Sequence, residues 1–337
     1  MKKIFAFICI FCGLILADEN LVQTSTQIST TKHKKVAVVG GLWPLPALIS
    51  LWVKDADLIY IPRPSHVAFE NSLFSEFDPQ TMQIPSGNSD NIEEILALKA
   101  DVYLCHKARS KVCEQLENSG VKTIQISTNI DKYSSFEVLK HWLNSLQSEF
   151  DIKAKDDALL DDIAKIRDEI AQKTANAPRP RAMILHKILP NNEYVVGVFS
   201  EYLLSNSGAS NVVGYVEGTK KINFEEILRL NPQIIYISNF TPQMPEFLLK
   251  KPEFSGVEAV KNGKVYKMPL ASYRSHAPNL ELGVILKFFA KHNHPEIFAD
   301  IDLAQEYKTH FKKYYGISLS DEQAQKILNP SSKAGEI

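Results

Sequence analysis

The sequence predicts an α/β protein made of two Rossmann-like lobes of parallel sheet and helices, joined by one long α-helix. Three observations support this architecture. One phrase occurs twice, as NIEEILALKADVYLC at 91–105 and as NFEEILRLNPQIIYI at 223–237. Short apolar runs alternate with helix-like segments in both halves of the chain, which is typical of parallel sheets. A single long helical pattern separates the two series.

The two copies of the phrase share Asn, two Glu, Ile and two Leu at matching positions. Each begins with a candidate N-cap, Asn91 or Asn223, followed by acidic residues that favour the positive end of a helix. A short break then leads to an apolar run, 102–105 or 234–237, that predicts a buried strand. Each copy is therefore expected to form a short helix and a strand in one of two similar lobes. The alternative is a chance match of common helix formers.

The N-terminal lobe is predicted to span 35–152 and the C-terminal lobe 179–320. Strands are expected at 34–41, 56–62, 102–105 and 121–127 in the first lobe, and at 181–187, 194–199, 234–238 and 264–269 in the second. Between the lobes, the stretch 153–178 has apolar residues at helical spacing and charges on the opposite face, and it ends at a proline. This pattern predicts the linking helix. Residues 321–337 follow as a tail.

The N-terminus has the pattern of a secretory signal peptide. A basic start, MKK, precedes the apolar run 4–16 and a small residue before polar sequence, which predicts a cleavable segment at 1–17 and an exported protein. A retained anchor is the alternative, but the run is short for a membrane span. Lipidation is not expected, because no small-residue motif precedes Cys9 or Cys12. The polar, Ser- and Thr-rich stretch 18–34 predicts a flexible leader.

Charge, cysteines and motifs restrict the function further. A formal net charge of −1 gives no electrostatic reason to expect a nucleic acid partner. Beyond the signal segment two cysteines remain, Cys105 and Cys113, which either pair in an oxidising compartment or stay as thiols. Neither G-x-S-x-G nor H-E-x-x-H occurs, and SNSGAS at 205–210 is only superficially similar to a hydrolase motif. A secreted α/β enzyme stays an alternative, although neither hydrolase motif supports it.

In their order and spacing these segments resemble the periplasmic substrate-binding proteins of ABC importers. The resemblance is to the class with one connecting helix, which takes up iron–siderophore, haem, cobalamin and related metal chelates. It is carried by both copies of the phrase, by VKNGKVYKMP at 260–269 and by LELGVILKFFAKHNHPE at 280–296. The resemblance implies a monomeric, non-enzymatic periplasmic protein without an intrinsic cofactor, which delivers its ligand to an ABC permease.

The resemblance also implies a role for one glutamate in each copy of the phrase. In this family one surface Glu per lobe docks onto arginines of the permease, and the matching positions are Glu93 and Glu225. A solvated helix start is the other explanation, because acidic residues suit the first turn of any helix.

Ligands of two-lobed binding proteins lie in the cleft between the lobes, against loops at strand ends. The candidate ligand-binding residues therefore follow predicted strands. They are Trp43, Arg63, His66, Asn88 and His106 in the N-terminal lobe, and Asn239, Tyr273, Arg274 and His276 in the C-terminal lobe. Tryptophan and tyrosine offer apolar faces to a chelator. Arg63 and Arg274 suit carboxylates or oxyanions, because a guanidinium donates hydrogen bonds in two directions.

These residues favour an anionic small-molecule chelate of iron, cobalt or nickel as the ligand. His276, which crowds together with Tyr273 and Arg274, is the candidate direct metal ligand, since imidazole binds first-row metals well. The alternative is a binder of a bare transition metal such as nickel or zinc. Such a site needs several converging imidazoles or carboxylates, and the loops do not contain an obvious set.

Overall fold

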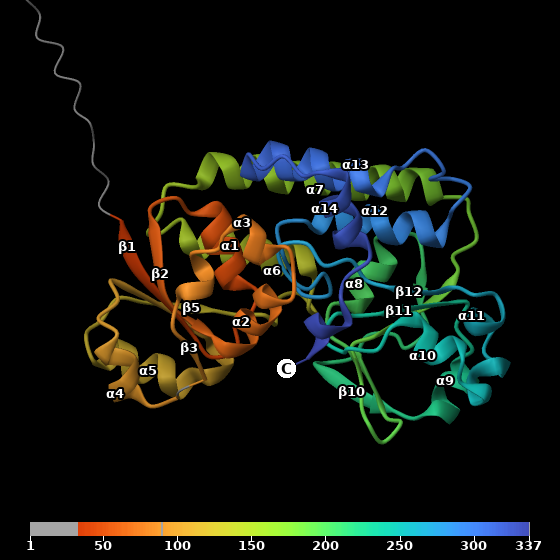
Figure 1. Ribbon diagram of the computed structural model, residues 1–337, viewed down its shortest axis with the longest axis horizontal. Coiled ribbons are helices and arrows are strands. Elements are labelled where there is room, and N and C mark those ends of the chain that lie inside the picture. Colours follow the sequence, from red (N-terminus) through yellow and green to blue (C-terminus); the bar gives the residue numbers. More distant parts are fainter. Residues whose placement is uncertain (1–32, 89, 337) are drawn as a thin grey trace, which may run out of the picture. The chain divides into compact units, whose positions relative to one another are not determined.

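The N-terminal lobe is built on a five-stranded parallel sheet with the order β3-β2-β1-β4-β5 (Figure 1). The computed structural model describes residues 33–88 and 90–336, so the predicted signal peptide and nearly all of the predicted leader lie outside it. The strands are β1 (Lys34–Val39), β2 (Ala56–Pro62), β3 (Ser86–Gly87), β4 (Val102–His106) and β5 (Thr123–Ile126). The α-helices are α1 (Leu45–Trp52), α2 (Arg63–Glu70), α3 (Phe74–Phe77), α4 (Ile92–Ala97), α5 (Ser110–Asn118) and α6 (Ser135–Leu146), with short 3-10 turns at Thr81–Gln83 and Lys107–Arg109.

The linking helix, α7 (Lys153–Thr174), is 22 residues long and contains neither glycine nor proline. The buried carboxylate of Asp156 ties it to the first lobe by accepting hydrogen bonds from Trp52 Nε1 (2.6 Å) in α1 and from Gln147 Nε2 (2.7 Å). On its other side α7 packs against α12 of the second lobe. None of the helices within residues 33–88 and 90–336 has the length and hydropathy needed to cross a bilayer.

The C-terminal lobe has a four-stranded parallel sheet of order β12-β11-β6-β9 and a small antiparallel sheet of order β10-β8-β7. The strands are β6 (Arg181–Leu185), β7 (Lys187–Ile188), β8 (Tyr194–Gly197), β9 (Ser210–Asn211), β10 (Thr219–Ile222), β11 (Ile234–Ile237) and β12 (Val265–Lys267). The helices are α8 (Ser200–Ser205), α9 (Phe224–Leu230), α10 (Pro245–Leu249), α11 (Glu258–Lys261), α12 (Leu282–Asn293), α13 (Leu303–His310) and α14 (Asp321–Leu328), with shorter turns η3 (Pro252–Gly256), η4 (Phe311–Tyr315) and η5 (Ser332–Gly335).

One expected strand of the parallel series belongs to the other sheet. The run at 194–199 forms β8, which pairs antiparallel with β7 and β10. Its connection to β7 is a short turn in which Asn192 adopts a left-handed conformation (φ 60°). A turn of this length can join only antiparallel strands, because a parallel pair needs a crossover of a dozen residues or more. The expected strand is present, but it lies outside the parallel sheet.

The repeated phrase builds the same unit in both lobes. Its strand pairs in parallel with the first strand of the lobe, β4 with β1 and β11 with β6. At the break, Lys99 (φ 52°) and Asn231 (φ 40°) both adopt the left-handed conformation. Just before the strand, the side chains of Asp101 and Gln233 both accept a backbone N–H from the first strand. The match is structural, and the prediction of two similar α/β lobes is confirmed.

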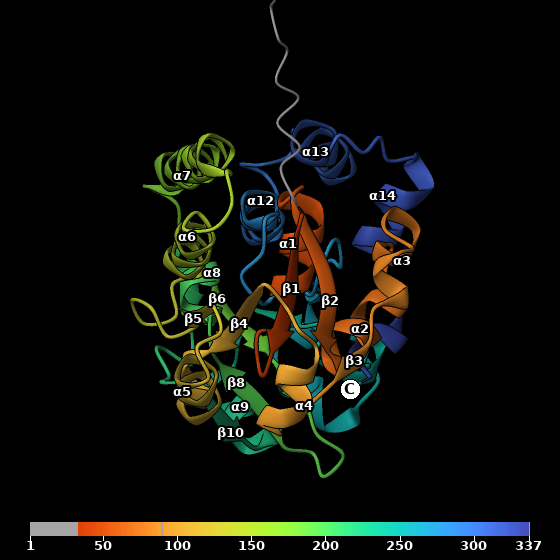
Figure 2. The ribbon, with the colours of Figure 1, turned by 90° about the vertical axis from the view of Figure 1, so that its left-hand side faces the viewer.

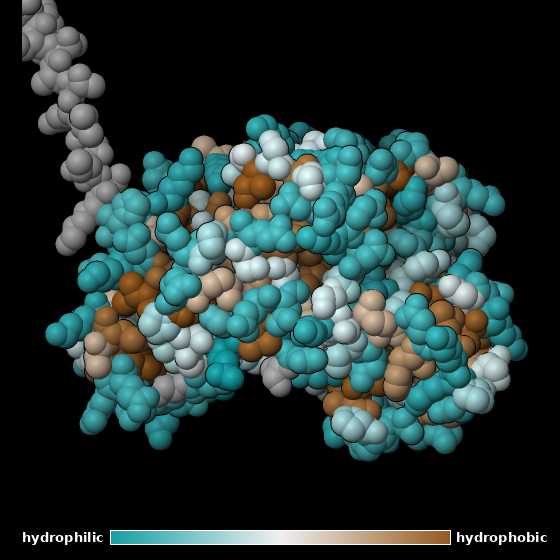
Figure 3. Space-filling view, viewed as in Figure 1, coloured by the Kyte–Doolittle hydropathy of each residue, from teal (hydrophilic) through white to brown (hydrophobic). Residues whose placement is uncertain are grey.

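The predicted C-terminal tail is folded. The backbone N–H of Leu270 donates to the carbonyl of Ile327 in α14 (2.9 Å), and Ile327 is buried. On the same helix, Gln323 and Lys326 contact the carboxylate of Glu76 in α3. This segment therefore touches both lobes. The surface of Figure 3 is mainly hydrophilic and is hollowed between the lobes, on the side away from α7.

Candidate ligand-binding site

Loops at the carboxyl ends of four parallel strands meet between the lobes, around the ring of Phe240. Its centroid lies 6.4 Å from the ring of Trp43 in the N-terminal lobe, 4.7 Å from His186 and 6.4 Å from Tyr273. These residues follow β1, β6, β11 and β12. The loops converge because the carboxyl ends of parallel strands lie at one edge of each sheet. We call the set the inter-lobe site: Trp43, His186, Phe240, Tyr273, Arg274 and His276.

Two imidazoles form the polar part of the inter-lobe site. His186 Nδ1 lies 2.9 Å from His276 Nδ1, and His276 Nε2 lies 3.1 Å from Ser200 Oγ. The Ser200 hydroxyl donates to the Gly197 carbonyl (2.5 Å), so it accepts from His276 Nε2. This network assigns the Nε2–H tautomer to His276 and makes Nδ1–H of His186 the donor of the pair. Both nitrogens of His276 are used, whereas Nε2 of His186 has no hydrogen-bond partner among the described residues.

The charged groups that act on this pair are cationic. Burial lowers the pKa of His276 to about 3. Burial, then His276, Lys187 and Arg274, lower the pKa of His186 well below its usual value. Burial, followed by Arg274, also lowers the pKa of Lys187. The two imidazoles are therefore neutral at pH 7, and the potential around them favours an anionic ligand.

Lys267 fixes the loop that carries Phe240. Its ammonium donates to the carbonyl oxygens of Ser238 (2.9 Å), Thr241 (2.7 Å) and Gln243 (3.0 Å). The side chain is almost fully buried, and this burial is the main cause that lowers its pKa to about 7. One ammonium thus organises the loop backbone in the way that a bound cation would.

The C-terminal candidates predicted from the sequence are all buried. Asn239 donates from Nδ2 to the carbonyl of Met268 (3.0 Å), and its Oδ1 has no hydrogen-bond partner among the residues that the structure describes. Tyr273, Arg274 and His276 are each at most 1% exposed. The structure therefore brings the last three together around Phe240, as part of the interior rather than as an open wall.

The N-terminal candidates are more exposed. Arg63 begins α2, although a loop was predicted here; Pro64 at the second helical position suits a helix start. The Arg63 side chain is exposed and makes no hydrogen bond or ion pair with any described residue. His66, on the same helix, lies 3.2 Å from the carbonyl oxygen of Met82. Asn88 is exposed just after β3.

His106 and the two cysteines belong to the end of β4. His106 Nε2 lies 3.0 Å from Thr128 Oγ1, and its Nδ1 accepts from the backbone N–H of Ala108 (3.1 Å). Burial is the main cause that lowers the pKa of His106. Cys105 and Cys113 form a disulfide that joins β4 to α5. His106 is therefore fixed by neighbours of its own lobe.

A preformed site for a bare metal ion is absent from the part of the chain that the structure describes. No group of three or more His, Cys, Asp or Glu side chains there is placed to hold one. Direct ligation by His276 would break one of its two hydrogen bonds. The free imidazole nitrogen of the pair belongs instead to His186.

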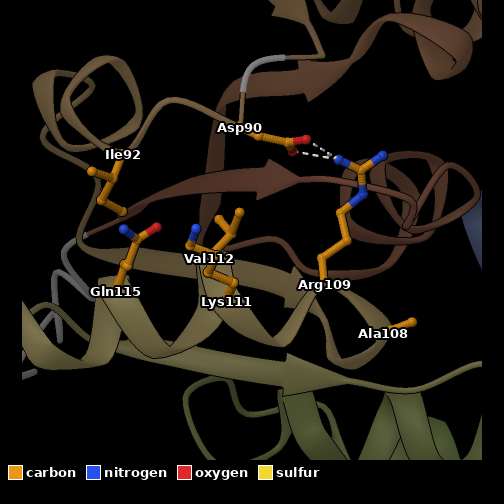
Figure 4. A pocket seen from close by; sticks show the side chains of 7 residues that line it. All are labelled: Asp90, Ile92, Ala108, Arg109, Lys111, Val112 and Gln115. Carbon is orange, nitrogen blue, oxygen red and sulfur yellow. Dashed lines mark hydrogen bonds and ion pairs between the residues drawn. The ribbon is translucent and has the colours of Figure 1, made fainter.

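A separate pocket of about 450 Å³ lies on the N-terminal lobe (Figure 4). The side chains of Asp90 and Arg109 form an ion pair at its edge. Ile92 at the start of α4 and Gln115 on α5 also line it. Asp90, two positions after the candidate Asn88, thus lines a pocket on the flank of the lobe.

Comparison with known proteins agrees with this architecture. The sequence profile described as periplasmic binding protein matches residues 66–271, more than half of the chain. The chain belongs to the periplasmic binding protein family. Its membership confirms the sequence-based recognition of an ABC importer binding protein of the class with one linking helix.

Three relatives place this periplasmic binding protein more closely. The molybdate-binding protein MolA of Haemophilus influenzae is 24% identical over 335 residues, covering 92% of this chain and 88% of MolA. A periplasmic solute binding protein from Veillonella parvula has a TM-score of 0.75 at 24% identity, over 88% of this chain and 92% of that one. Helicobacter pylori CeuE with Ni(II) bound has a TM-score of 0.66 at 22% identity, over 88% and 95%. At these identities the two solved structures show that the fold is shared.

The two glutamates singled out in the repeated phrase occupy equivalent, exposed positions. Glu93 and Glu225 are each the second residue of a helix, α4 or α9, behind an Asn N-cap. Neither side chain makes a hydrogen bond or ion pair within the described residues. Figures 1 and 2 show α4 and α9 on the same side of the protein, away from α7.

One inter-lobe contact gave no signal in the sequence. Asp131, Lys132 and Tyr133 are consecutive residues with φ of 41°, 55° and 60°. The Tyr133 ring packs edge-on against Phe199 of the C-terminal lobe, with centroids 5.9 Å apart, and Phe199 is also left-handed (φ 57°). Non-glycine residues rarely adopt the left-handed backbone conformation, and no sequence pattern predicts where they do so. Phe240, by contrast, directly follows Asn239, which was a predicted candidate.

Proposed function

We propose that this periplasmic binding protein captures an anionic metal complex between its lobes and delivers it to an ABC permease. The observation that carries the proposal is the buried guanidinium of Arg274, which lies over the ring of Phe240 at 4.9 Å. Together with Lys187 it places positive charge near the neutral His186. A cationic, partly apolar site suits an anionic chelate of iron, cobalt or nickel. The half-buried Trp43 beside Phe240 offers a flat surface to the organic part of the chelator.

A tetrahedral metal oxyanion is the second candidate ligand. The relative MolA is named for molybdate binding. An oxyanion has only acceptor oxygens, so it needs donors and positive charge. Arg63 and Arg274 would supply both. The Nδ1–H group of His186 would not, because it donates its hydrogen bond to His276. A bare transition metal has less support, because three converging ligands are absent from the described residues.

Titration followed by tryptophan fluorescence tests the ligand. The panel contains haem, a ferric siderophore, cobalamin, molybdate and Ni²⁺ without a chelator. We expect an anionic complex or molybdate to bind, and Arg63→Ala to weaken binding about tenfold through loss of one charge-assisted contact. Arg229→Ala, which removes an exposed arginine on α9, should change nothing. Tight binding of bare Ni²⁺ alone, unaffected by Arg63→Ala, would contradict the proposal.

Docking to the permease is assigned to Glu93 and Glu225. Both are exposed, unpaired within the described residues and on one side of the protein, so arginines of a partner would meet them without breaking an existing ion pair. Changing both to lysine should abolish ligand uptake by the reconstituted importer and leave ligand affinity intact. The matched control reverses Glu169 and Glu296, which are exposed elsewhere. Normal uptake by the Glu93→Lys, Glu225→Lys protein would refute the assignment.

A further inference from the structure

The C-terminal residues 331–336 lie over the guanidinium of Arg274. After α14 the chain crosses to the inter-lobe site, where η5 packs against α2 of the N-terminal lobe. Ala334 is fully buried, while Ser332 and Lys333 are exposed. In Figure 1 the end of the chain lies between the two lobes. We call residues 331–336 the C-terminal strap.

The strap supplies hydrogen-bond acceptors to Arg274. Nε and Nη2 of Arg274 donate to the carbonyl oxygen of Ala334 at 3.2 and 2.9 Å, and Nη2 is 3.5 Å from that of Glu336. Nη1 lies 3.4 Å from the hydroxyl of Tyr273, and the guanidinium stacks over the ring of Phe240 at 4.9 Å. The donors are thus occupied by neutral oxygens.

The charge of Arg274 has no counter-charge in the described part of the chain. The side chain is 0% exposed, yet it forms no ion pair with any described carboxylate. Two further basic side chains, Lys187 and Lys267, are close enough that Arg274, after burial, contributes to the lowered pKa of each. A buried charge is normally paired, because carbonyl acceptors satisfy its N–H groups but do not neutralise it. The vicinity of Arg274 therefore has the composition of an anion site.

We propose that the C-terminal strap is an internal occupant of an oxyanion site built on Arg274, and that it leaves when a ligand with carboxylate or metal-oxyanion groups binds. The carbonyl oxygens of Ala334 and Glu336 occupy the positions that ligand oxygens would take. The inference deepens the proposed function and rests on it. If the strap occupies this site, it competes with the anionic ligand and lowers the affinity of the full chain for that ligand.

The strap is attached in a way that permits its release. The preceding helix α14 is held separately, through the backbone bond between Leu270 and Ile327 and through the contacts to Glu76. The strap itself buries chiefly Ala334 and Gly335. A Cβ at Gly335 would lie 2.2 Å from the carbonyl carbon and oxygen of Thr241. Any side chain at 335 would therefore displace the strap, while α14 keeps its place.

Chemical modification of arginine tests the proposal without any ligand. Phenylglyoxal labelling, read by mass spectrometry of the peptide that contains Arg274, compares the full chain, Gly335→Ala and a protein shortened after residue 330. We expect protection in the full chain and about tenfold faster labelling in both variants, which is the change expected when a charge-assisted contact is lost. Ser332→Ala is the matched control, because the side chain of Ser332 is exposed and its removal should not move the strap. Equal labelling in all four proteins would overturn the proposal.

Anion binding supplies the second arm. Molybdate and ferric citrate, added separately, distinguish a metal oxyanion from a carboxylate chelate. At least one of these anions should protect Arg274 in the shortened protein. Its affinity for the shortened protein should be about tenfold higher than its affinity for the full chain. Absence of protection by both, or equal affinity in both proteins, would overturn the proposal. A different result would count against the proposed function and not against the strap. In that case an anion would protect Arg274 in the shortened protein, but no complex of the panel would support uptake by the importer.

Circular dichroism and thermal unfolding accompany each variant. Gly335→Ala changes one methyl group, so it reports on the strap even if the shortened protein does not fold.

Discussion

Replacing Phe240 with alanine removes the ring around which the two lobes meet. Phe240 is 7% exposed and contacts Trp43, His186 and Tyr273, with the guanidinium of Arg274 over its face. Truncation of a buried phenylalanine costs about 3–5 kcal/mol. Aromatic pairs add about 0.5–1.5 kcal/mol each beyond buried area, so we expect a loss near 4 kcal/mol. At about 1.5–2 °C per kcal/mol for a chain of this size, Tm should fall by roughly 6–8 °C.

Denaturant unfolding and tryptophan emission measure this change. Of the three tryptophans, Trp52 and Trp142 are at most 1% exposed, so Trp43 is the one whose surroundings can become wetter. Phe240→Ala should shift the emission to longer wavelength, and adding Trp43→Phe should abolish the shift. Phe240→Leu is the control, because a hydrophobic side chain of similar volume should cost less than about 1.5 kcal/mol. A loss below about 1 kcal/mol for Phe240→Ala, with unchanged emission, would refute the packing of Phe240 between the lobes.

Three further predictions concern motion, pH and the disulfide. Scattering curves with and without ligand should differ in radius of gyration by less than about 1 Å, because α7 has no glycine or proline hinge and buried clusters join the lobes; a large decrease would contradict this. Burial lowers the pKa of His276 from 6.5 in the unfolded chain to about 3 in the folded protein. As the pH falls from 6.5 toward 3, the unfolded chain therefore binds the proton first, and the free energy of unfolding should decrease by about 3 kcal/mol by pH 4. The unfolding free energy of His276→Gln should fall less steeply over that range, and parallel profiles would refute the assignment. Changing Cys105 and Cys113 to alanine should cost about 2.5 kcal/mol, from the short loop that the disulfide closes, whereas an unchanged midpoint of urea unfolding would show that the thiols are not paired.

Periodicity and local chemistry, which depend on neighbouring residues only, allowed much of the fold to be predicted. The repeated phrase encodes an Asn N-cap, a short helix, a break and a buried strand, and both copies fold in this way. The linking helix follows from apolar residues at helical spacing without glycine or proline. These signals are local because caps, helices and buried strands each form over a few successive residues.

The candidate site was predicted only in part. Strand ends pointed to the loops of Trp43, Asn239 and Tyr273–His276, which do converge. The residue choices within those loops were less accurate, since burial separates neighbours: Asn239 lies inside the lobe, while the adjacent Phe240 lies at the centre of the inter-lobe site. Arg63 begins a helix, and Asp90, two positions after the candidate Asn88, lines a flank pocket.

The sequence by itself determined two α/β units, the helix between them and the edges at which functional side chains gather. Tertiary structure alone decided which of those side chains meet. The bond between His186 and His276 joins residues 90 positions apart, and the strap reaches Arg274 across 60. Long-range contacts of this kind depend on how the two lobes pack, and no local pattern records that packing. The left-handed turn at Tyr133 has the same origin, because its ring packs against Phe199 of the other lobe.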